Sequence, residues 1–374
     1  MPEVARGLEG VVVAPTSISK VDGEKGALIY QGIDIHDLAK HSTFEEVVYL
    51  LWNGVLPTLD QLGAFSKELA ADRQVPAPVL DIVERIAAKD DAMATLRTAV
   101  SALSAFDSEA EDMSVEASHR KARRLTASMG TIVAAIGRAR AGLSFVPPET
   151  QRSYAGNFLY MFTGKNPDPV IERMFDQALV LHADHGFNAS TFAARVTAST
   201  QADMHSAVVS AIGTLKGPLH GGANIRVMQM LLQIHASGAS PDTWVRNQIA
   251  AKERIMGFGH RVYKVEDPRA VHLRRACQAV GEAQGDSKWF HMSQAIERVV
   301  REEKGLAPNV DFYSASTYYM MGIPLELYTA LFAMSRVAGW TAHVMEQLLD
   351  NRLIRPRSEY VGKRGVPYVL REDR

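Results

Sequence analysis

Apolar residues recur at helical spacing along nearly the whole chain, with one exception near the N-terminus. The exception lies between residues 11 and 35, where Val11–Val13 and Ala27–Tyr30 are short apolar runs on either side of the polar segment Asp22–Gly26. Short apolar runs that flank a glycine-containing turn are typical of a β-hairpin. We therefore predict a minor N-terminal hairpin with strands at these two runs, followed by helices.

Helix start signals precede several of the periodic segments. Thr43 with Glu46 matches a capping box, in which two side chains satisfy the free N–H groups at a helix N-terminus. Asp168–Pro169 and Asp267–Pro268 each place an N-cap residue before a proline at the first helical position. The first of these two helices is expected to end at Gly186, because glycine is a common helix stop.

The pattern as a whole predicts an all-α fold. Its last apolar segment predicts one long helix over residues 325–349. The sequence contains no fixed-period repeat, low-complexity tract or Gly/Ser-rich linker. A second domain would therefore be inserted into the helical body and not attached behind it.

The composition is that of a globular protein with a large core. The chain has 374 residues, of which 47% are hydrophobic, and its formal net charge of −1 favours neither nucleic acid nor a membrane surface. Charges interrupt every apolar stretch well before the roughly 20 residues that a membrane span needs. The N-terminus lacks the basic and apolar regions of a signal peptide, and the only cysteine, Cys277, fits a reducing compartment. We predict a cytoplasmic protein.

The first candidate for chemistry is His220, within the glycine-rich segment Gly217–Asn224. Glycine and proline end the preceding helix there, and a new apolar helix begins near Asn224. The positive end of a helix dipole disfavours imidazolium, so His220 is expected to be neutral and able to donate a hydrogen bond. A histidine that merely caps a turn explains this segment equally well.

The second candidate segment runs from Gly257 to Arg269. Arg269 lies in the first turn of a predicted helix, where a cation opposes the dipole, which suggests a bound anion or a pair with Glu266 or Asp267. From Lys252 to Arg275, seven Lys or Arg residues face three acids, a local charge of +4 that suits a polyanion. A solvated helix face accounts for part of it. The Gly-x-Gly at its start is only a weak dinucleotide signal, because no third glycine follows.

Three further segments carry charged residues in apolar surroundings. Asp311 stands among apolar neighbours before a predicted helix, where it could be a base or, on the segment alone more readily, an N-cap. Phe332 and Arg336 share one face of the long helix at i, i+4 spacing, so the arginine must pair or extend to solvent. Arg355 follows that helix in an extended Arg-Pro stretch.

Taken in order along the chain, these segments resemble the citrate synthase family. Six motifs carry the resemblance: Asp184-His185-Gly186, Leu219-His220-Gly221, Gly257-Phe258-Gly259-His260 with Asp267-Pro268-Arg269, Asn309-Val310-Asp311, Ser335-Arg336 and Arg355-Pro356. The nine-residue step from His260 to Arg269 is also that of the family. The resemblance covers essentially the whole chain, and six motifs in the family's order make it specific.

The resemblance implies a reaction and a role for each residue. Acetyl-CoA would condense with oxaloacetate, and citryl-CoA would be hydrolysed to citrate and CoA, without a metal or any cofactor other than the CoA substrate. His220, His260 and Asp311 would be catalytic, Asp311 as the base. The remaining residues would bind substrate: His185, Arg269, Phe332, Arg336 and Arg355 for oxaloacetate, and Arg261 and Lys264 for CoA phosphates.

The resemblance also implies an architecture. Residues 1–221 and 322–374 would form a large helical domain, and residues 222–321 a smaller helical domain inserted into it, with the substrates in the cleft between them. The protein would be a homodimer in which Arg355 reaches the site of the neighbouring subunit. The chain is too short for the additional N-terminal domain of the large, NADH-regulated bacterial form.

Three other functions compete with this one. The nearest is 2-methylcitrate synthase, which uses propionyl-CoA with the same catalytic residues, and one methylene changes discrimination by only about 1–3 kcal/mol. A metal site could use His182 and His185, which are three residues apart, but no set of carboxylates or thiolates accompanies them. A non-catalytic helical scaffold would leave the order and spacing of the His, Asp and Arg residues unexplained.

Overall fold

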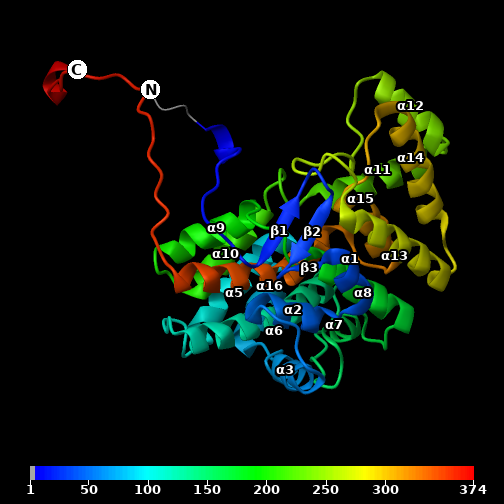
Figure 1. The fold of residues 1–374 in the computed structure, drawn as a ribbon, viewed down its shortest axis with the longest axis horizontal. Coiled ribbons are helices and arrows are strands. Elements are labelled where there is room, and N and C mark those ends of the chain that lie inside the picture. Colours follow the sequence, from blue (N-terminus) through cyan, green and yellow to red (C-terminus); the bar gives the residue numbers. More distant parts are fainter. Residues whose placement is uncertain (1–4) are drawn as a thin grey trace.

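The computed structural model describes residues 5–374, and this part of the chain is almost entirely helical (Figure 1). Ten α-helices precede residue 220: α1 (Ile35–His41), α2 (Phe44–Asn53), α3 (Leu59–Ala71), α4 (Ala77–Ile86), α5 (Ala92–Leu103), α6 (Val115–Arg140), α7 (Tyr154–Thr163), α8 (Pro169–His182), α9 (Ala189–Ser199) and α10 (Met204–Leu215). Six follow it: α11 (Ala223–Ser237), α12 (Pro241–Ala250), α13 (Pro268–Gln284), α14 (Lys288–Lys304), α15 (Val310–Met320) and α16 (Tyr328–Leu349). The prediction of an all-α fold is confirmed.

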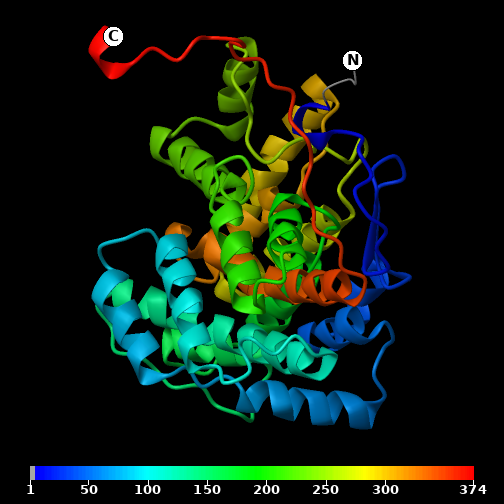
Figure 2. The same ribbon diagram turned by 90° about the vertical axis from the view of Figure 1, so that its left-hand side faces the viewer.

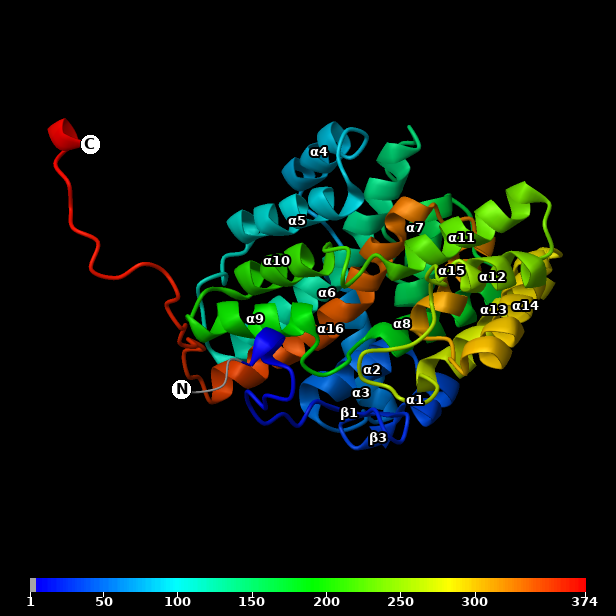
Figure 3. The same ribbon diagram turned by 90° about the horizontal axis from the view of Figure 1, so that it is seen from above.

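Helices α11 to α15 lie together at one side of the molecule, and the other helices surround α16 (Figure 1 and Figure 3). Within the first group, α13 packs on α15, α12 packs on α14, and α11 packs on α15. The predicted limits of a small domain, residues 222 and 321, stay a prediction. None of the helices within residues 5–374 combines the length and the apolar character that crossing a membrane requires.

The only sheet in the described residues is a small antiparallel one near the N-terminus. It consists of β1 (Ser19–Asp22), β2 (Ala27–Tyr30) and β3 (Ile33–Asp34), in that order. Asp22 pairs with Ala27 and Ser19 with Tyr30, so the turn between β1 and β2 spans the four residues after Asp22. Leu28 and Tyr30 of β2 are fully buried, which anchors the hairpin on the helices.

The predicted first strand at Val11–Val13 is wrong. These valines are in irregular backbone, and the side chain of Val12 is 89% exposed. The strand is β1 instead, because a tight turn can join only the residues that directly adjoin it. Ser19 is buried and Lys20 is exposed, as alternation along this strand requires, although the segment has no continuous apolar run for sequence analysis to detect.

The two predicted Asp-Pro helix starts are N-caps, as expected. The carboxylate of Asp168 accepts hydrogen bonds from Val170 N and Ile171 N, and the carboxylate of Asp267 accepts one from Arg269 N. Both aspartates precede a proline at the first helical position, where the missing N–H costs nothing. These starts depend on neighbouring residues alone, so the sequence is sufficient to predict them.

Two details of the predicted helix ends differ from the structure. Thr43 is the N-cap of α2, as predicted, and its Oγ1 accepts from Glu46 N, which is the first half of a capping box; both halves of a box are present instead at Thr58 and Gln61, the start of α3. Gly186 does not end α8, which stops at His182. Gly186 lies in the following loop with φ +57°, and its N–H donates to the carboxylate of Asp184 at 2.9 Å.

Helix α16 forms the centre of the molecule, and nearly all of its residues are buried. It packs against α2, α6, α8, α9 and α10. At Gly339 it approaches the chain after α8 so closely that a Cβ atom would lie 2.5 Å from Ala183 O and 2.4 Å from Asp184 Oδ1. Gly339 N donates to Ala183 O at 3.1 Å, which fixes the start of the loop that carries His185.

Beyond α16 the chain is extended from about residue 350 to residue 370 and then forms a short 3₁₀ helix, Arg371–Asp373. In Figure 1 and Figure 3 this stretch runs away from the helices, and in Figure 2 it comes towards the viewer and passes in front of them. Several of its large apolar side chains are exposed, among them Val361 at 90% and Tyr368 at 81%.

Candidate active site

The residues singled out from the sequence come from loops and helix ends that face one another. The three histidines lie in loops: His185 between α8 and α9, His220 between α10 and α11, and His260 between α12 and α13. Arg269 and Asp311 lie in the first turns of α13 and α15, respectively. Phe332 and Arg336 lie on α16. The ring centroids of His185 and His260 are 5.5 Å apart. Burial, and after it the charges of Arg269, Arg336, His260 and His220, hold the pKa of His185 well below its usual range. These groups therefore form one cluster.

His220 is a neutral imidazole whose proton position is defined by its neighbours. Its Nε2 accepts the backbone N–H of Ser190 at 3.3 Å and lies 2.9 Å from Ser190 Oγ. A backbone N–H can only donate, so Nε2 carries no hydrogen and Nδ1 is the N–H group. Burial, then the charge of Arg336, lowers the pKa of His220 to about 4. The expected neutral state therefore has burial as its main cause, not the helix dipole.

His260 is also neutral, with the opposite tautomer. Its Nδ1 accepts N–H groups from Val262 at 3.0 Å and from Tyr263 at 3.1 Å, so Nε2 carries the hydrogen. Burial, and next the charge of Arg269, lowers the pKa of His260 to about 4, while Asp267 opposes the shift. Each of the two histidines thus has one N–H group, Nδ1–H of His220 and Nε2–H of His260, without a hydrogen-bond partner among residues 5–374.

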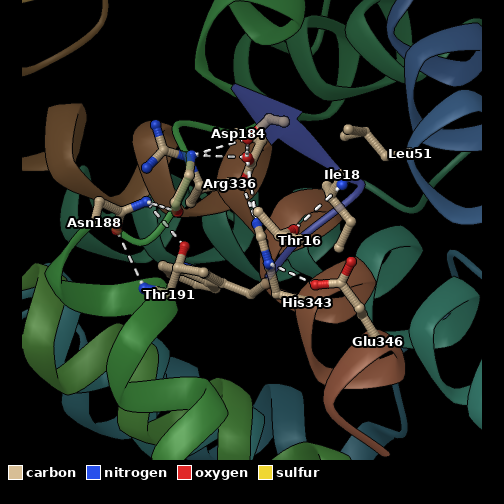
Figure 4. Close-up of polar contacts among 12 residues, drawn as sticks. Thr16, Ile18, Leu51, Asp184, Asn188, Thr191, Arg336, His343 and Glu346 are labelled. Atoms are coloured by element: carbon tan, nitrogen blue, oxygen red, sulfur yellow. Dashed lines mark hydrogen bonds and ion pairs between the residues drawn. The ribbon is translucent and has the colours of Figure 1, made fainter. Parts of the chain in front are cut away.

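The loop that carries His185 rests on a buried polar network (Figure 4). The carboxylate of Asp184, which is fully buried, accepts from Gly186 N and Ser19 Oγ, and His343 Nε2 lies 3.4 Å from it. The other ring nitrogen of His343 faces Glu346 at 3.8 Å. These contacts join the hairpin, the loop and α16, so the backbone on either side of His185 is fixed.

Arg269 pairs with Asp267, one of the two outcomes that its position suggested. Its Nε and Nη2 bind the two carboxylate oxygens at 2.9 and 2.7 Å, and both residues are almost fully buried. Asp267 also accepts Val310 N at 3.2 Å, so the pair links the starts of α13 and α15. The pair uses two guanidinium nitrogens and leaves Nη1 outside it.

Arg336 makes fewer hydrogen bonds than a fully buried guanidinium group requires. It is 1% exposed, its Nε donates to His182 O at 2.6 Å, and its guanidinium stacks on Phe332 with 4.6 Å to the ring centroid. Its Nη2 is buried without a hydrogen-bond partner in the structure. Burial lowers the pKa of Arg336 to about 10. A buried cation with a free N–H group is an electrostatic site for an anion.

Asp311 is not the helix cap that its segment alone favoured. The N-cap of α15 is Asn309, whose Oδ1 accepts Asp311 N at 3.0 Å, and Asp311 lies in the first helical turn. Its carboxylate is half-buried, and burial is the main reason why its pKa is raised to about 6. A carboxylate with this pKa is ionised at neutral pH and is a stronger base than an ordinary aspartate.

Asn309 also fixes the geometry between Asp311 and His260. Its side-chain amide donates to Gly259 O at 2.9 Å, and its backbone N–H donates to Gly257 O at 2.9 Å. Gly257 has φ +84°, and a Cβ atom there would lie 2.7 Å from the ring of Phe312. The base and the histidine are therefore held by one rigid connection.

Two polar neighbours of the cluster were not found from the sequence. Ser190 fixes the tautomer of His220, and Tyr263 OH lies 3.1 Å from His185 Nε2. Tyr263 belongs to the candidate segment Gly257–Arg269, whereas Ser190 lies in α9, after the motif Asp184-His185-Gly186, and neither residue has a diagnostic spacing. Their roles depend on contacts between loops that are distant in sequence.

Comparisons with known proteins agree with this arrangement. The sequence pattern of the family described as "Citrate synthase, C-terminal domain" matches residues 7–357. The chain belongs to the citrate synthase family. Citrate synthase from Haloferax volcanii is 54% identical to it over 376 residues, which cover 100% of this chain and 99% of that protein.

Two further similarities define its place in the citrate synthase family. A 2-methylcitrate synthase from Mycobacterium tuberculosis is 44% identical, over 96% of this chain and 91% of its own length. A solved structure of citrate synthase from Thermoplasma acidophilum is also similar to this chain, with a TM-score of 0.92, 32% identity and coverage of 100% of both chains. That structure is a ternary complex with carboxymethyl coenzyme A and oxaloacetate.

Arg261 and Lys264, the two residues predicted to bind CoA, lie at the edge of the cluster and not inside it. Arg261 is 3.7 Å from Glu9, Lys264 pairs with Glu24, and all four side chains are about three-quarters exposed. Arg261 lines a cavity of about 690 Å³ that also borders His260.

The structure does not bring Arg355 to the cluster within its own chain. It lies in the extended stretch after α16 and is exposed. The expectation that it enters the neighbouring subunit's site stays a prediction. As for the competing metal site, no group of three or more His, Cys, Asp or Glu side chains in residues 5–374 is arranged to hold a metal ion.

Proposed function

We propose that the protein condenses acetyl-CoA with oxaloacetate and hydrolyses the resulting citryl-CoA to citrate and CoA, as an acyltransferase that converts the acyl group into an alkyl group. The observation that carries the proposal is the combination within one cluster of a carboxylate with raised pKa, two neutral N–H donors and a buried arginine with a free nitrogen. This set matches a reaction in which a carbanion equivalent forms beside a dicarboxylate.

Asp311 is the base in this proposal, and His220 is its electrophilic partner. Asp311 removes a proton from the methyl group of acetyl-CoA, and the Nδ1–H of His220 donates to the thioester oxygen as the enolate forms. An ordinary aspartate is a poor base for a thioester methyl, so both the raised pKa and the donor are needed. The neutral tautomer of His220 has its hydrogen on Nδ1, so this donor is present at neutral pH.

His260 acts on the other substrate. Its Nε2–H donates to the ketone oxygen of oxaloacetate, polarises it for attack by the enolate carbon, and protonates the alkoxide that results. Arg269 and Arg336 bind the two carboxylates, because the guanidinium fork matches a carboxylate in two parallel hydrogen bonds. His185 and Phe332 complete the pocket, together with Arg355 from the neighbouring subunit.

The CoA moiety is proposed to occupy the cavity of about 690 Å³ beside His260. Arg254, Arg261 and Lys304 line this cavity, and Lys264 lies on the adjacent loop. These cations suit the phosphates of CoA. Arg261 and Lys264 would exchange Glu9 and Glu24 for phosphate oxygens, at little cost because exposed ion pairs are weak.

Closure of residues 222–321 over the rest of the chain would exclude water during condensation and admit one for hydrolysis. A homodimer would supply Arg355 to each site. The proposed location is the cytoplasm, and the reaction would belong to the tricarboxylic acid cycle. The second candidate function is 2-methylcitrate synthesis from propionyl-CoA, which the 44% identical relative from Mycobacterium tuberculosis supports.

The experiment that tests the proposal is a thiol-release assay with oxaloacetate, comparing acetyl-CoA with propionyl-CoA. We expect kcat/KM to favour acetyl-CoA by about 10-fold or more, the usual range for one methylene. A preference for propionyl-CoA would establish the second function instead. Absence of turnover with both thioesters would refute the proposed chemistry.

A further inference from the structure

We infer that the turn of the N-terminal hairpin positions His260, by holding the loop Val262–Glu266 through close backbone contacts at Gly23 and Gly26. The inference rests on the proposed function, in which His260 acts on oxaloacetate. In Figure 1 the turn between β1 and β2 adjoins the yellow-green loop between α12 and α13. The hairpin turn thus lies against the loop that follows His260.

The first contact is at Gly23. Its carbonyl oxygen accepts Lys264 N at 2.9 Å, and a Cβ atom at this position would lie 2.1 Å from Val262 O. The φ of Gly23 lies outside the left-handed region, so its backbone conformation does not demand glycine. Close approach of two backbones is therefore the reason for glycine at this position.

The second contact is at Gly26, where a Cβ atom would lie 2.7 Å from Val265 Cγ2 and 3.0 Å from Glu266 O. An ion pair between Glu24 and Lys264 adds a third connection between the turn and the loop. Because the three contacts follow one another along both segments, the turn packs along the loop and does not merely touch it.

The contact at Gly23 acts on a hydrogen bond to the histidine itself. Val262 O and Tyr263 N belong to the same peptide group, which is planar and rigid. Tyr263 N donates to His260 Nδ1 at 3.1 Å, so any force on Val262 O tilts the N–H group that orients the ring. The same loop carries Tyr263 OH to His185 at 3.1 Å.

The other side of His260 has its own support. Asn309 binds Gly257 O and Gly259 O, and Gly259 N donates to Ala307 O at 3.1 Å. The segment on that side is therefore anchored on the start of α15. The hairpin turn supplies the corresponding anchor after His260, from a part of the sequence more than 200 residues away.

The test is Gly23→Ala in the full-length protein. The added methyl group has to displace Val262 O, and a misplacement of about 1 Å at a catalytic group reduces turnover by on the order of 10²-fold. We expect kcat to fall by at least about tenfold, while the affinity for oxaloacetate changes less than about threefold because its arginines are on other elements. The melting temperature should fall as well, because the atom that has to move belongs to the backbone.

Gly63→Ala is the matched control, because a Cβ atom at this position in α3 meets nothing within 4 Å. It should leave kcat unchanged. Val265→Ala is a milder second variant that removes the packing against Gly26 without a clash, and it keeps the test decisive if Gly23→Ala does not fold. A several-fold lower kcat in Val265→Ala supports the inference, and an unchanged kcat in the variants that fold overturns it.

A second readout does not depend on turnover. The pKa of His260 can be measured by NMR titration of histidine-labelled protein, with His260→Gln to assign the signal. We expect a pKa near 4 in the wild type and a higher pKa in Gly23→Ala, because a displaced loop admits water. The charged and titratable groups that face His260, namely His185, Tyr263, Asp267 and Arg269, are unchanged in the variant. If the wild type lacks turnover, the proposed function fails, and the titration still tests the positioning. An identical titration in both proteins would overturn it.

Discussion

Replacing Asp311 by asparagine is expected to remove most of the turnover and, at the same time, to stabilise the fold. The two effects have one cause, which is the burial of a carboxylate in its charged form. Asparagine has nearly the same size and cannot lose a proton, so it keeps the packing and removes both the base and the cost of its charge.

The size of the stability effect follows from the pKa. Burial raises the pKa of Asp311 from 3.8 to about 6, and one unit corresponds to about 1.36 kcal/mol. Because the folded-state pKa is the higher one, the carboxyl group costs the fold nothing below about pH 4, and the cost grows until about pH 6 and is then constant. Asp311→Asn should therefore increase the free energy of unfolding by about 3 kcal/mol at about pH 8 and by little at about pH 4.

Two assays measure the outcome. Thiol release should decrease by about 10²–10⁴-fold in Asp311→Asn, the usual contribution of a positioned base. Urea unfolding at both pH values should give the difference in stability. In the wild type, the acid limb of kcat/KM should lie near pH 6 and belong to Asp311, because His220 and His260, with pKa values near 4, stay neutral there.

Asp168→Asn is the matched control, because Asp168 is an N-cap and asparagine caps a helix equally well. It should leave turnover and stability unchanged. The reasoning is refuted if Asp311→Asn turns over within a factor of about ten of the wild type. It is also refuted if the variant is no more stable than the wild type at the higher pH, since the carboxylate would then not be buried in its charged form.

Three other predictions test the binding residues. Arg336→Ala should weaken oxaloacetate binding by about 10- to 150-fold in calorimetry, because a charge-assisted hydrogen bond of about 1.5–3 kcal/mol is lost, and it should leave CoA binding unchanged. If the variant and the wild type bind oxaloacetate with equal affinity, Arg336 is not part of the site. Arg261→Ala with Lys264→Ala should raise the KM for acetyl-CoA and reduce its dependence on salt, and an unchanged KM at low salt would exclude both from CoA binding. Mixing inactive Arg355→Ala with inactive Asp311→Asn should restore activity after subunit exchange, towards about half of wild type per heterodimer, because one of its two sites has both lesions and the other neither. Full exchange without recovery would mean that Arg355 does not act across the dimer.

The sequence was sufficient where neighbouring residues decide the structure. Asp168 and Asp267 start helices because each carboxylate caps N–H groups two or three residues further along, and the proline beside it completes the signal. The first strand was predicted in the wrong place because Val11–Val13 form an apolar run that is exposed, whereas β1 is polar in part and is selected by pairing across the turn.

The cluster itself was predicted from the order of six motifs and not from any one of them. Read alone, the segment of Asp311 favoured a helix cap, and Arg269 fitted an ion pair as well as an anion site. The structure assigns the cap to Asn309 and shows the pair with Asp267. Local residues could not decide between these outcomes, because each one satisfies the same short-range rules.

By itself, the sequence determined which residue types are present, where most helices start, and the family to which their order belongs. Only the tertiary structure decided their chemical state. The tautomers of His220 and His260 depend on N–H groups of particular loops, and the pKa of Asp311 and the unpaired nitrogen of Arg336 depend on burial. The contact of Gly23 with Val262 joins segments more than 200 residues apart. Burial and contacts of this kind are properties of the packed chain, since the same residues in an unfolded chain would be hydrated and independent.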